Sequence, residues 1–129
     1  MNFLKAAVAI VDGKACVALG NSAQQLPMPA DQAYYQTLTG RAVTFGIRPE
    51  DITWQHTPQS VQVDAQVELI EDLGADLLIH SRVGHLKLVA RADRETGITT
   101  GMATRLFFPV HKLHLFIDHR RVDLPRHPR

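Results

Sequence analysis

The chain has 129 residues, 45% of them hydrophobic and 21% charged, and a net charge of +1 at pH 7. This is the composition of an ordinary globular domain that can bury a core, and the near-neutral charge argues against strong attraction to nucleic acid or an anionic membrane. The single cysteine, Cys16, excludes an internal disulfide and lies in an apolar run, so we expect a buried, unreactive thiol in a reducing compartment. No signal segment opens the sequence and no apolar stretch could span a bilayer, which predicts a cytoplasmic protein.

Alternating apolar residues predict that the chain begins with a β-hairpin. The residues of one parity, which would share the buried face of the first strand, are Leu4, Ala6, Val8 and Ile10. Asp12-Gly13 is a strong turn signal, and residues 15–19 would form the returning strand. Residues 31–38 could form a helix of two turns, with Asp31 as its cap and Gly40 as its stop.

A strand over residues 42–45 then runs into a polar corner, the sequence GIRPED. Arg48 precedes a proline and is therefore pushed towards an extended conformation. Pro49 suits the first position of a helical turn, because its missing N–H is no loss there. Glu50 and Asp51 follow in the first turn, where carboxylates meet the positive end of the peptide dipoles. The pattern predicts a sharp bend and a short helical turn that present Arg48 and Glu50 on a stiff surface.

The second half of the chain reads as further short strands. The clearest is half-buried, with the inward positions Val61, Val63, Ala65, Val67 and Leu69. Residues 77–83 would form the next strand, followed by a turn at Gly84-His85 and a continuation through 86–88. Two more short strands are expected over 104–109 and 113–117. In the first of these two, Phe107 and Phe108 are adjacent, so a regular strand would turn one of them outward.

Many short strands separated by turns about every ten residues predict an all-β fold, a small barrel or a sandwich. The aperiodic segment 54–60 reads as a connector between two β-rich halves that share one core. We expect one compact domain over residues 1–118 and a flexible tail over 119–129. The tail is rich in basic residues, which we interpret as solvated: Arg120, Arg121, Arg126 and Arg129.

No residue pattern indicates catalysis. There is no glycine-rich phosphate loop, and the acidic pairs Glu71-Asp72 and Asp93 with Glu95 read as solvated turn residues. Three histidines fall close together at the end of the chain, at positions 111, 114 and 119. Strand alternation places the first two on opposite faces, so we expect no metal site. Aromatic residues are not interleaved with Lys or Arg, so nucleic-acid binding by an OB-type barrel is also a weak hypothesis.

Four segments, in this order, resemble the C-terminal regulatory region of ATP-binding subunits of ABC importers of the maltose, sn-glycerol-3-phosphate and sugar group. Residues 1–4 resemble the segment that follows the ATPase domain. Residues 40–52 contain the signature of a strand ending in G-[IV]-R-P-E-[DH]. Residues 67–76 resemble the following V-x-x-x-E-x-L-G-x-[ED] segment, and 114–116 resemble the closing H-L-F. The resemblance covers nearly the whole chain up to about Asp118.

The chain departs from the family pattern at two places. The family often has an acidic residue after the glycine at 101, where this chain has Met102. The acidic residue that usually follows the terminal Phe is displaced by Ile117, and Asp118 comes one place later. These departures bear on the register of the last strand and not on the family.

The resemblance implies an OB-fold-like β-barrel of the type described as a TOBE domain, with the helical turn after the R-P-E corner. It implies a non-catalytic domain, because the ATPase domain with its ATP and Mg²⁺ would lie upstream. Two parent subunits would pair through these domains, at the inner face of the bacterial plasma membrane, alongside the transmembrane subunits. In some members the region also receives regulatory proteins or small ligands. The residues that we assign to such contacts are Arg48, Pro49, Glu50, Glu71, Leu73 and Gly74.

Two alternatives stay open from the sequence. Arg48 and Glu50 could instead pair with each other and brace the corner, a contact worth little on a surface. The barrel could also act as a sensor of an oxyanion or other small ligand, as some single-barrel relatives do for molybdate-like anions. Such a site would need converging donors, for which the candidates are Ser81, Arg82, Lys87 and Arg91.

Overall fold

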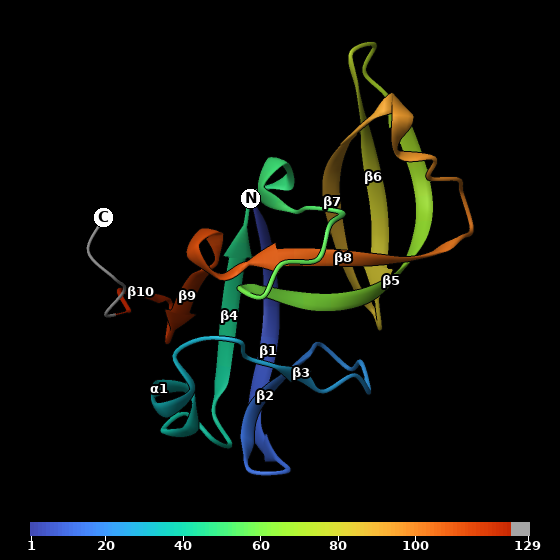
Figure 1. The fold of residues 1–129 in the computed structure, drawn as a ribbon. Helices are drawn as coiled ribbons and strands as arrows, with labels where there is room; N and C mark the ends of the chain where they lie inside the picture. The colour runs from blue at the N-terminus through green and yellow to red at the C-terminus, as the bar shows by residue number, and fades with distance from the viewer. Residues whose placement is uncertain (125–129) are drawn as a thin grey trace.

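The structure, a computed structural model, describes residues 1–124 (Figure 1). Within these residues ten strands form two antiparallel sheets, in the orders β10-β9-β4-β1-β2-β3 and β7-β6-β5-β8. The strands of the first sheet are β1 (Asn2–Val11), β2 (Lys14–Leu19), β3 (Leu26–Pro27), β4 (Ala42–Ile47), β9 (His114–Ile117) and β10 (Arg120–Val122). Those of the second are β5 (Ser60–Asp72), β6 (Asp76–Val83), β7 (Leu86–Asp93) and β8 (Ala103–Pro109). The predicted all-β class is confirmed.

The first hairpin forms as its turn signal predicts. Asp12 and Gly13 both have positive φ, 52° and 79°, as a two-residue turn of type I′ requires. Three of the four predicted inward positions of β1 are buried, but Ile10 is 44% exposed. The reason is the length of the strand, because its last residues project beyond the core.

The short helix α1 (Gln32–Gln36) occupies part of the segment predicted to be helical. Asp31 stands at the N-cap position with φ 58°, and its side chain forms no cap hydrogen bond, so the predicted cap is wrong. Gln32 anchors the helix to β2 instead: its side-chain oxygen accepts from the Ala15 N–H at 2.8 Å, and its amide donates to the Ala15 carbonyl at 3.0 Å. A side chain of the first turn thus replaces the cap as the local constraint.

Strand β5 bends strongly and leads into a hairpin that projects from the body of the molecule (Figure 1). Its pairing with β6 shifts between Val67 and Leu69, so Glu68 occupies a β-bulge. The extra residue reverses the alternation of side chains. Leu69, predicted to be inward, is therefore 55% exposed, and Ile70 packs against a small apolar cluster instead.

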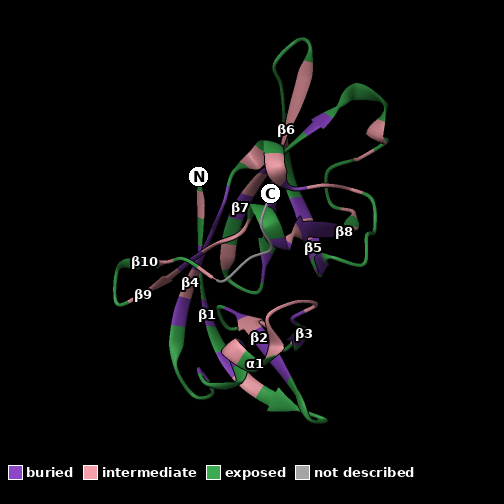
Figure 2. Ribbon diagram, turned by 60° about the vertical axis from the view of Figure 1, so that its left-hand side comes forward, coloured by how far each residue is buried: buried purple, intermediate pink, exposed green. Residues whose placement is uncertain are grey.

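The main core draws residues from both sheets. Buried segments occur on strands of both sheets (Figure 2). Both Phe107 and Phe108 are buried, with 5% and 2% exposure, so the prediction that one faces outward is wrong. The connector covers Phe107: Thr53 exchanges two backbone hydrogen bonds with it, both 2.9 Å, and the His56 ring meets it edge to face.

The chain does not end its ordered pairing at Asp118. Asp118 and His119, with φ of 52° and 65°, form a tight turn that returns the chain as β10 against β9. The predicted tail from 119 is therefore wrong for residues 120–122, whereas Arg126 and Arg129 lie outside the described residues.

The lone thiol behaves as the sequence predicts. Cys16 is a free cysteine with 3% exposure, and burial raises the pKa of its thiol. Among the described residues, no helix is both long and apolar enough to cross a membrane.

Candidate functional site

The R-P-E corner adopts the predicted conformation. Arg48 is extended, with φ −78° and ψ 148°, and a single 3-10 turn, η1 (Pro49–Asp51), follows it. The turn packs against β7 of the second sheet, and Ile52 directly after it is buried at 2% exposure. The corner is thus rigidly fixed on its inner side, while the Arg48 and Glu50 side chains are exposed.

The charges at the corner bear on the interpretation that Arg48 and Glu50 brace it. Neither Arg48 nor Glu50 forms an ion pair with any residue in the range 1–124, so the pair that would brace the corner is not formed. Asp51, in contrast, lies 4.0 Å from the ammonium of Lys112. The Arg48 and Glu50 charges are left available to a group outside the described part of the chain.

His114 lies beside this corner, opposite Gly46 in the β4–β9 register. Burial lowers the pKa of His114, and the guanidinium groups of Arg121 and Arg48 lower it further, against the opposing charge of Asp51. Burial is thus the largest cause of the lowered pKa, and the two arginines add to it.

The second group of predicted contact residues lies at the tip of the β5–β6 hairpin. Leu73 is 50% exposed and Gly74 has φ 94°, a left-handed conformation that suits glycine. The Leu73 N–H donates to the Asp76 carbonyl at 2.8 Å, which closes the turn. Glu71 pairs across the hairpin with the His80 ring. Leu73 is therefore an exposed apolar side chain on a well-defined turn.

A residue that the sequence analysis did not single out for this site holds the tip in place. Arg94, in the 3-10 turn η2 (Arg94–Thr96), donates to the Gly74 carbonyl at 2.6 Å and also binds the Asp72 carboxylate. The hydrogen bond from Arg94 and one from the Gly74 N–H lower the pKa of Asp72, and the same contact raises the pKa of Arg94. The only sequence signal for this contact was the opposite charge of Asp72 and Arg94. The two residues are 22 positions apart, and no local sequence pattern links them.

The two predicted contact groups do not form one cluster. The corner lies near the N-terminus against β7, and the tip lies at the far end of the projecting hairpin (Figure 1). A partner would therefore contact the corner and the hairpin tip as two separate surfaces.

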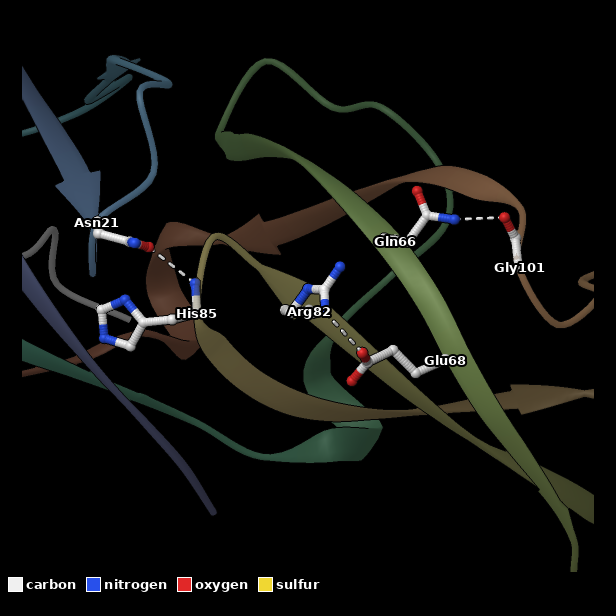
Figure 3. A network of polar contacts seen from close by, with 6 residues as sticks. All are labelled: Asn21, Gln66, Glu68, Arg82, His85 and Gly101. Carbon is white, nitrogen blue, oxygen red and sulfur yellow. Dashed lines mark hydrogen bonds and ion pairs between the residues drawn. The ribbon is translucent and has the colours of Figure 1, made fainter.

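The four candidate oxyanion donors do not all converge either: Ser81 and Lys87 line one depression, whereas Arg82 and Arg91 are paired with carboxylates. Ser81 is 1% exposed, and its hydroxyl has no hydrogen-bond partner within residues 1–124. Arg82 is exposed and pairs with Glu68 at 3.0 Å (Figure 3). Lys87 lies opposite Arg82 in the β6–β7 register, on the outer side of the sheet.

Arg91, the fourth donor, lies four residues beyond Lys87 on β7 and pairs with Asp76 at 3.8 Å. Lys87 and Arg91 start about 13 Å apart along the strand, and the Arg91 guanidinium already has a carboxylate partner. For metals, residues 1–124 contain no group of three or more His, Cys, Asp or Glu side chains that could hold an ion.

Comparison with protein-family models places these features in a known family. A model described as "TOBE domain" matches residues 45–116, more than half of the chain, and a model described as "MalK OB fold domain" matches residues 1–52. The chain belongs to the TOBE domain family. The R-P-E corner lies within both matched ranges, and the hairpin tip lies within the TOBE range. The predicted OB-like fold is confirmed with the family.

Relatives among curated proteins include ATP-binding proteins of importers. The sn-glycerol-3-phosphate import ATP-binding protein UgpC of Escherichia coli O6:H1 is 41% identical over 86 residues, which cover 64% of this chain and 23% of that protein. The UgpC of Salmonella choleraesuis is 40% identical over 91 residues, 70% of this chain and 24% of that protein. The trehalose/maltose import ATP-binding protein MalK of Thermococcus litoralis is 35% identical over 82 residues, which cover 60% of this chain and 22% of that protein. The alignment thus spans only about a quarter of the length of each relative.

A solved structure shares the fold. The cytoplasmic molybdate-binding protein ModG, with molybdate bound, superposes with a TM-score of 0.68 over 90% of this chain and 95% of that chain. Its sequence is only 13% identical, so the likeness concerns the arrangement of the strands and does not extend to the ligand.

Proposed function

We propose that the chain is a non-catalytic regulatory and dimerisation domain of the ATP-binding subunit of a bacterial ABC importer, of the sugar or sn-glycerol-3-phosphate class. The observation that carries this proposal is the family membership, together with relatives whose names are those of import ATP-binding proteins. ATP and Mg²⁺ would bind the ATPase domain of the parent subunit, which lies upstream in this proposal.

The domain would act through protein contacts. Arg48 and Glu50 stand on a corner fixed by the buried Ile52, and their charges are not used within the described residues. Leu73 offers an exposed apolar side chain on a tip that Arg94 braces. Fixed exposed groups lose little conformational entropy on association, which favours their use at an interface.

In the assembled importer two such subunits would pair through these domains. The partners would be the second copy, the ATPase domain of the parent subunit, the transmembrane subunits and, in some systems, a regulatory protein. The location would be cytoplasmic and peripheral, at the inner face of the plasma membrane. Neither nucleic acid nor direct membrane insertion enters this proposal.

Sedimentation equilibrium of the chain from micromolar to millimolar concentration tests the dimerisation. We expect reversible self-association that weakens at least tenfold in the double variant Arg48→Glu/Leu73→Asp. The variant Lys14→Glu, a charge reversal at the exposed β1–β2 turn, serves as a matched control and should associate like the original chain. A strict monomer at millimolar concentration would remove dimerisation from the proposal.

The oxyanion-sensor alternative has less support, because only Ser81 and Lys87 of its four candidate donors line a common depression and both arginines are paired with carboxylates. Calorimetric titration with molybdate, phosphate, sulfate and glycerol phosphate distinguishes it. Our proposal predicts no heat of binding from any of the four anions, whereas saturable binding of one of them would favour the sensor.

A further inference from the structure

The first sheet has an outer face, turned away from the second sheet, that combines exposed aromatic residues with cations. The strand registers define it: Phe3 is opposite Gly46, and Lys5 is opposite Thr44. Thr44 is in turn opposite Phe116 on β9, and Phe116 is opposite Arg121 on β10. We call the set Phe3, Lys5, Thr44, Phe116 and Arg121 the aromatic face.

One aromatic residue of this face, Phe3, is largely exposed, and the other, Phe116, is half-buried. Phe3 is 61% exposed, and its ring meets that of Phe116 edge to face, with the centroids 5.8 Å apart. Met1, 48% exposed, lies next to them over Gly46. A Cβ atom at position 46 would come within 2.7 Å of the Met1 sulfur and 3.1 Å of the Phe116 ring, so the glycine makes room for this apolar cluster.

These side chains border an open depression that a partner could enter. Phe3 and Phe116 line it together with Lys5, Thr44, Asp118 and His119. Exposed apolar patches with a polar border are a common feature of protein interaction sites.

Positive charge dominates the border of the face. Lys5 forms no ion pair with any residue of the described chain. The nearby carboxylates are already engaged: Asp118 with Arg41 at 3.4 Å, and Asp123 with Arg121 at 3.8 Å. Arg121 and Arg41 thus each have a carboxylate partner, and Lys5 is the cation of this face that has none within residues 1–124.

We propose that the aromatic face docks an acidic segment of a partner protein, in which an apolar side chain lies between two carboxylates. The apolar side chain would cover Phe3 and Phe116. One carboxylate would pair with Lys5, and the other would replace Asp123 as the partner of Arg121. This inference goes beyond the proposed function, because it concerns a different surface from the corner and the hairpin tip and a partner other than a second copy.

The spacing of the cations defines the segment further. Three strand-to-strand steps separate Lys5 from Arg121, a distance of about 14 Å. In an extended peptide, side chains four residues apart lie on the same side and about 13 Å apart. The pattern acidic-x-apolar-x-acidic therefore matches the face.

Geometry favours a peptide over single-stranded nucleic acid. The planes of Phe3 and Phe116 are inclined by 66°, so the rings do not form a flat platform for successive stacked bases. The net charge of +1 would also give little attraction to a polyphosphate backbone.

The test uses the acetylated and amidated peptide Glu-Thr-Leu-Thr-Glu, titrated into the ¹⁵N-labelled chain and followed by amide chemical shifts. We expect saturable shifts that are largest at Phe3, Lys5, Thr44, Phe116 and Arg121. The variant Lys5→Glu should weaken binding at least fivefold, and the variant Lys14→Glu should not.

The peptide Lys-Thr-Leu-Thr-Lys and the oligonucleotide (dT)₁₀ serve as matched probes. Equal shifts with the lysine peptide, shifts located elsewhere, or tighter binding of (dT)₁₀ at this face would each overturn the inference. The sedimentation result for Arg48→Glu/Leu73→Asp is independent of these titrations, so the two proposals can fail separately.

Discussion

The side chain of Asn2 forms with the backbone of Val89 the two hydrogen bonds that a neighbouring strand would form. Its amide oxygen accepts from the Val89 N–H at 2.8 Å, and its amide nitrogen donates to the Val89 carbonyl at 2.9 Å. The same nitrogen donates to the Ile47 carbonyl at 3.1 Å. Asn2 therefore ties β1 and β4 of the first sheet to the edge strand β7 of the second.

Replacement of Asn2 should cost more stability than its size suggests. Asn2→Ala leaves the polar groups of Val89 without this partner, and we expect a loss of about 1–3 kcal/mol in the free energy of unfolding. Asn2→Asp should also destabilise the chain, because a carboxylate cannot donate to the carbonyls of Ile47 and Val89. Urea denaturation measures the free energy of unfolding of both variants. Gln25→Ala, at an exposed position, is the control. An Asn2→Ala value equal to that of the control would contradict this account.

A close contact between two turns should make Gly84 intolerant of a side chain. A Cβ atom there would lie 2.9 Å from the backbone nitrogen of Ser22 and would collide with the Asn21 side chain, which accepts the His85 N–H at 2.8 Å (Figure 3). Gly84 has φ 58°, whereas Gly97 has φ 75° and open space around it.

Gly97→Ala should therefore cost only the left-handed backbone penalty, about 1–2 kcal/mol. Gly84→Ala should cost roughly 1–3 kcal/mol more, since the two turns must also separate. Thermal and urea unfolding of the two variants give the comparison. Equal losses would show that the contact between the turns contributes nothing.

Arg94 should control the titration of Asp72. Removal of the guanidinium in Arg94→Ala deletes the largest cause of the lowered pKa, so the pKa of Asp72 should rise towards the ordinary value for aspartate. Carboxyl ¹³C shifts followed against pH measure the change. Arg105→Ala, which removes the partner of Asp64, is the matched control and should leave the Asp72 titration unchanged. An unchanged Asp72 in Arg94→Ala would refute the bracing of the tip.

His114 should make the fold less stable in mild acid. Its pKa is lower in the folded chain than the ordinary value of about 6.5, so the unfolded chain takes up this proton first. The stability that the folded chain gains from a neutral His114 is fully present above about pH 6.5. It is lost as the pH falls through the pKa that His114 has in the folded chain.

The variant His114→Gln should accordingly lose less stability between pH 7 and pH 5 than the original chain. Arg121→Gln should raise the pKa of His114, because one of the two cations that lower it is gone. Urea unfolding at a series of pH values and ¹H–¹⁵N spectra of the imidazole provide the measurements. Identical pH slopes with and without His114 would exclude this effect.

The features predicted correctly from the sequence are those fixed by neighbouring residues. Asp12-Gly13 specifies its hairpin turn because both positions need positive φ, and Arg48-Pro49 specifies the bend because proline restricts itself and the residue before it. The family motif then assigned the corner to a TOBE domain. In each case the controlling interaction lies within a few residues along the chain.

The features missed depend on distant partners. The bulge at Glu68 is set by the pairing of β5 with β6, and the burial of Phe107 depends on the connector at Thr53. The link between the sheets relies on amide side chains such as Asn2 and Gln24, which pair with backbone groups 87 and 40 residues away. An isolated asparagine or glutamine gives no sequence signal for such a role.

The central claim, that this domain associates with a second copy through the Arg48 corner and the Leu73 tip, is tested most directly by isotope-filtered nuclear Overhauser spectra. An equimolar mixture of ¹³C,¹⁵N-labelled and unlabelled chain at millimolar concentration would report only contacts between copies. The account predicts intermolecular signals from residues 48–50 and 71–74. Intermolecular signals confined to other surfaces, or none at all at that concentration, would contradict it.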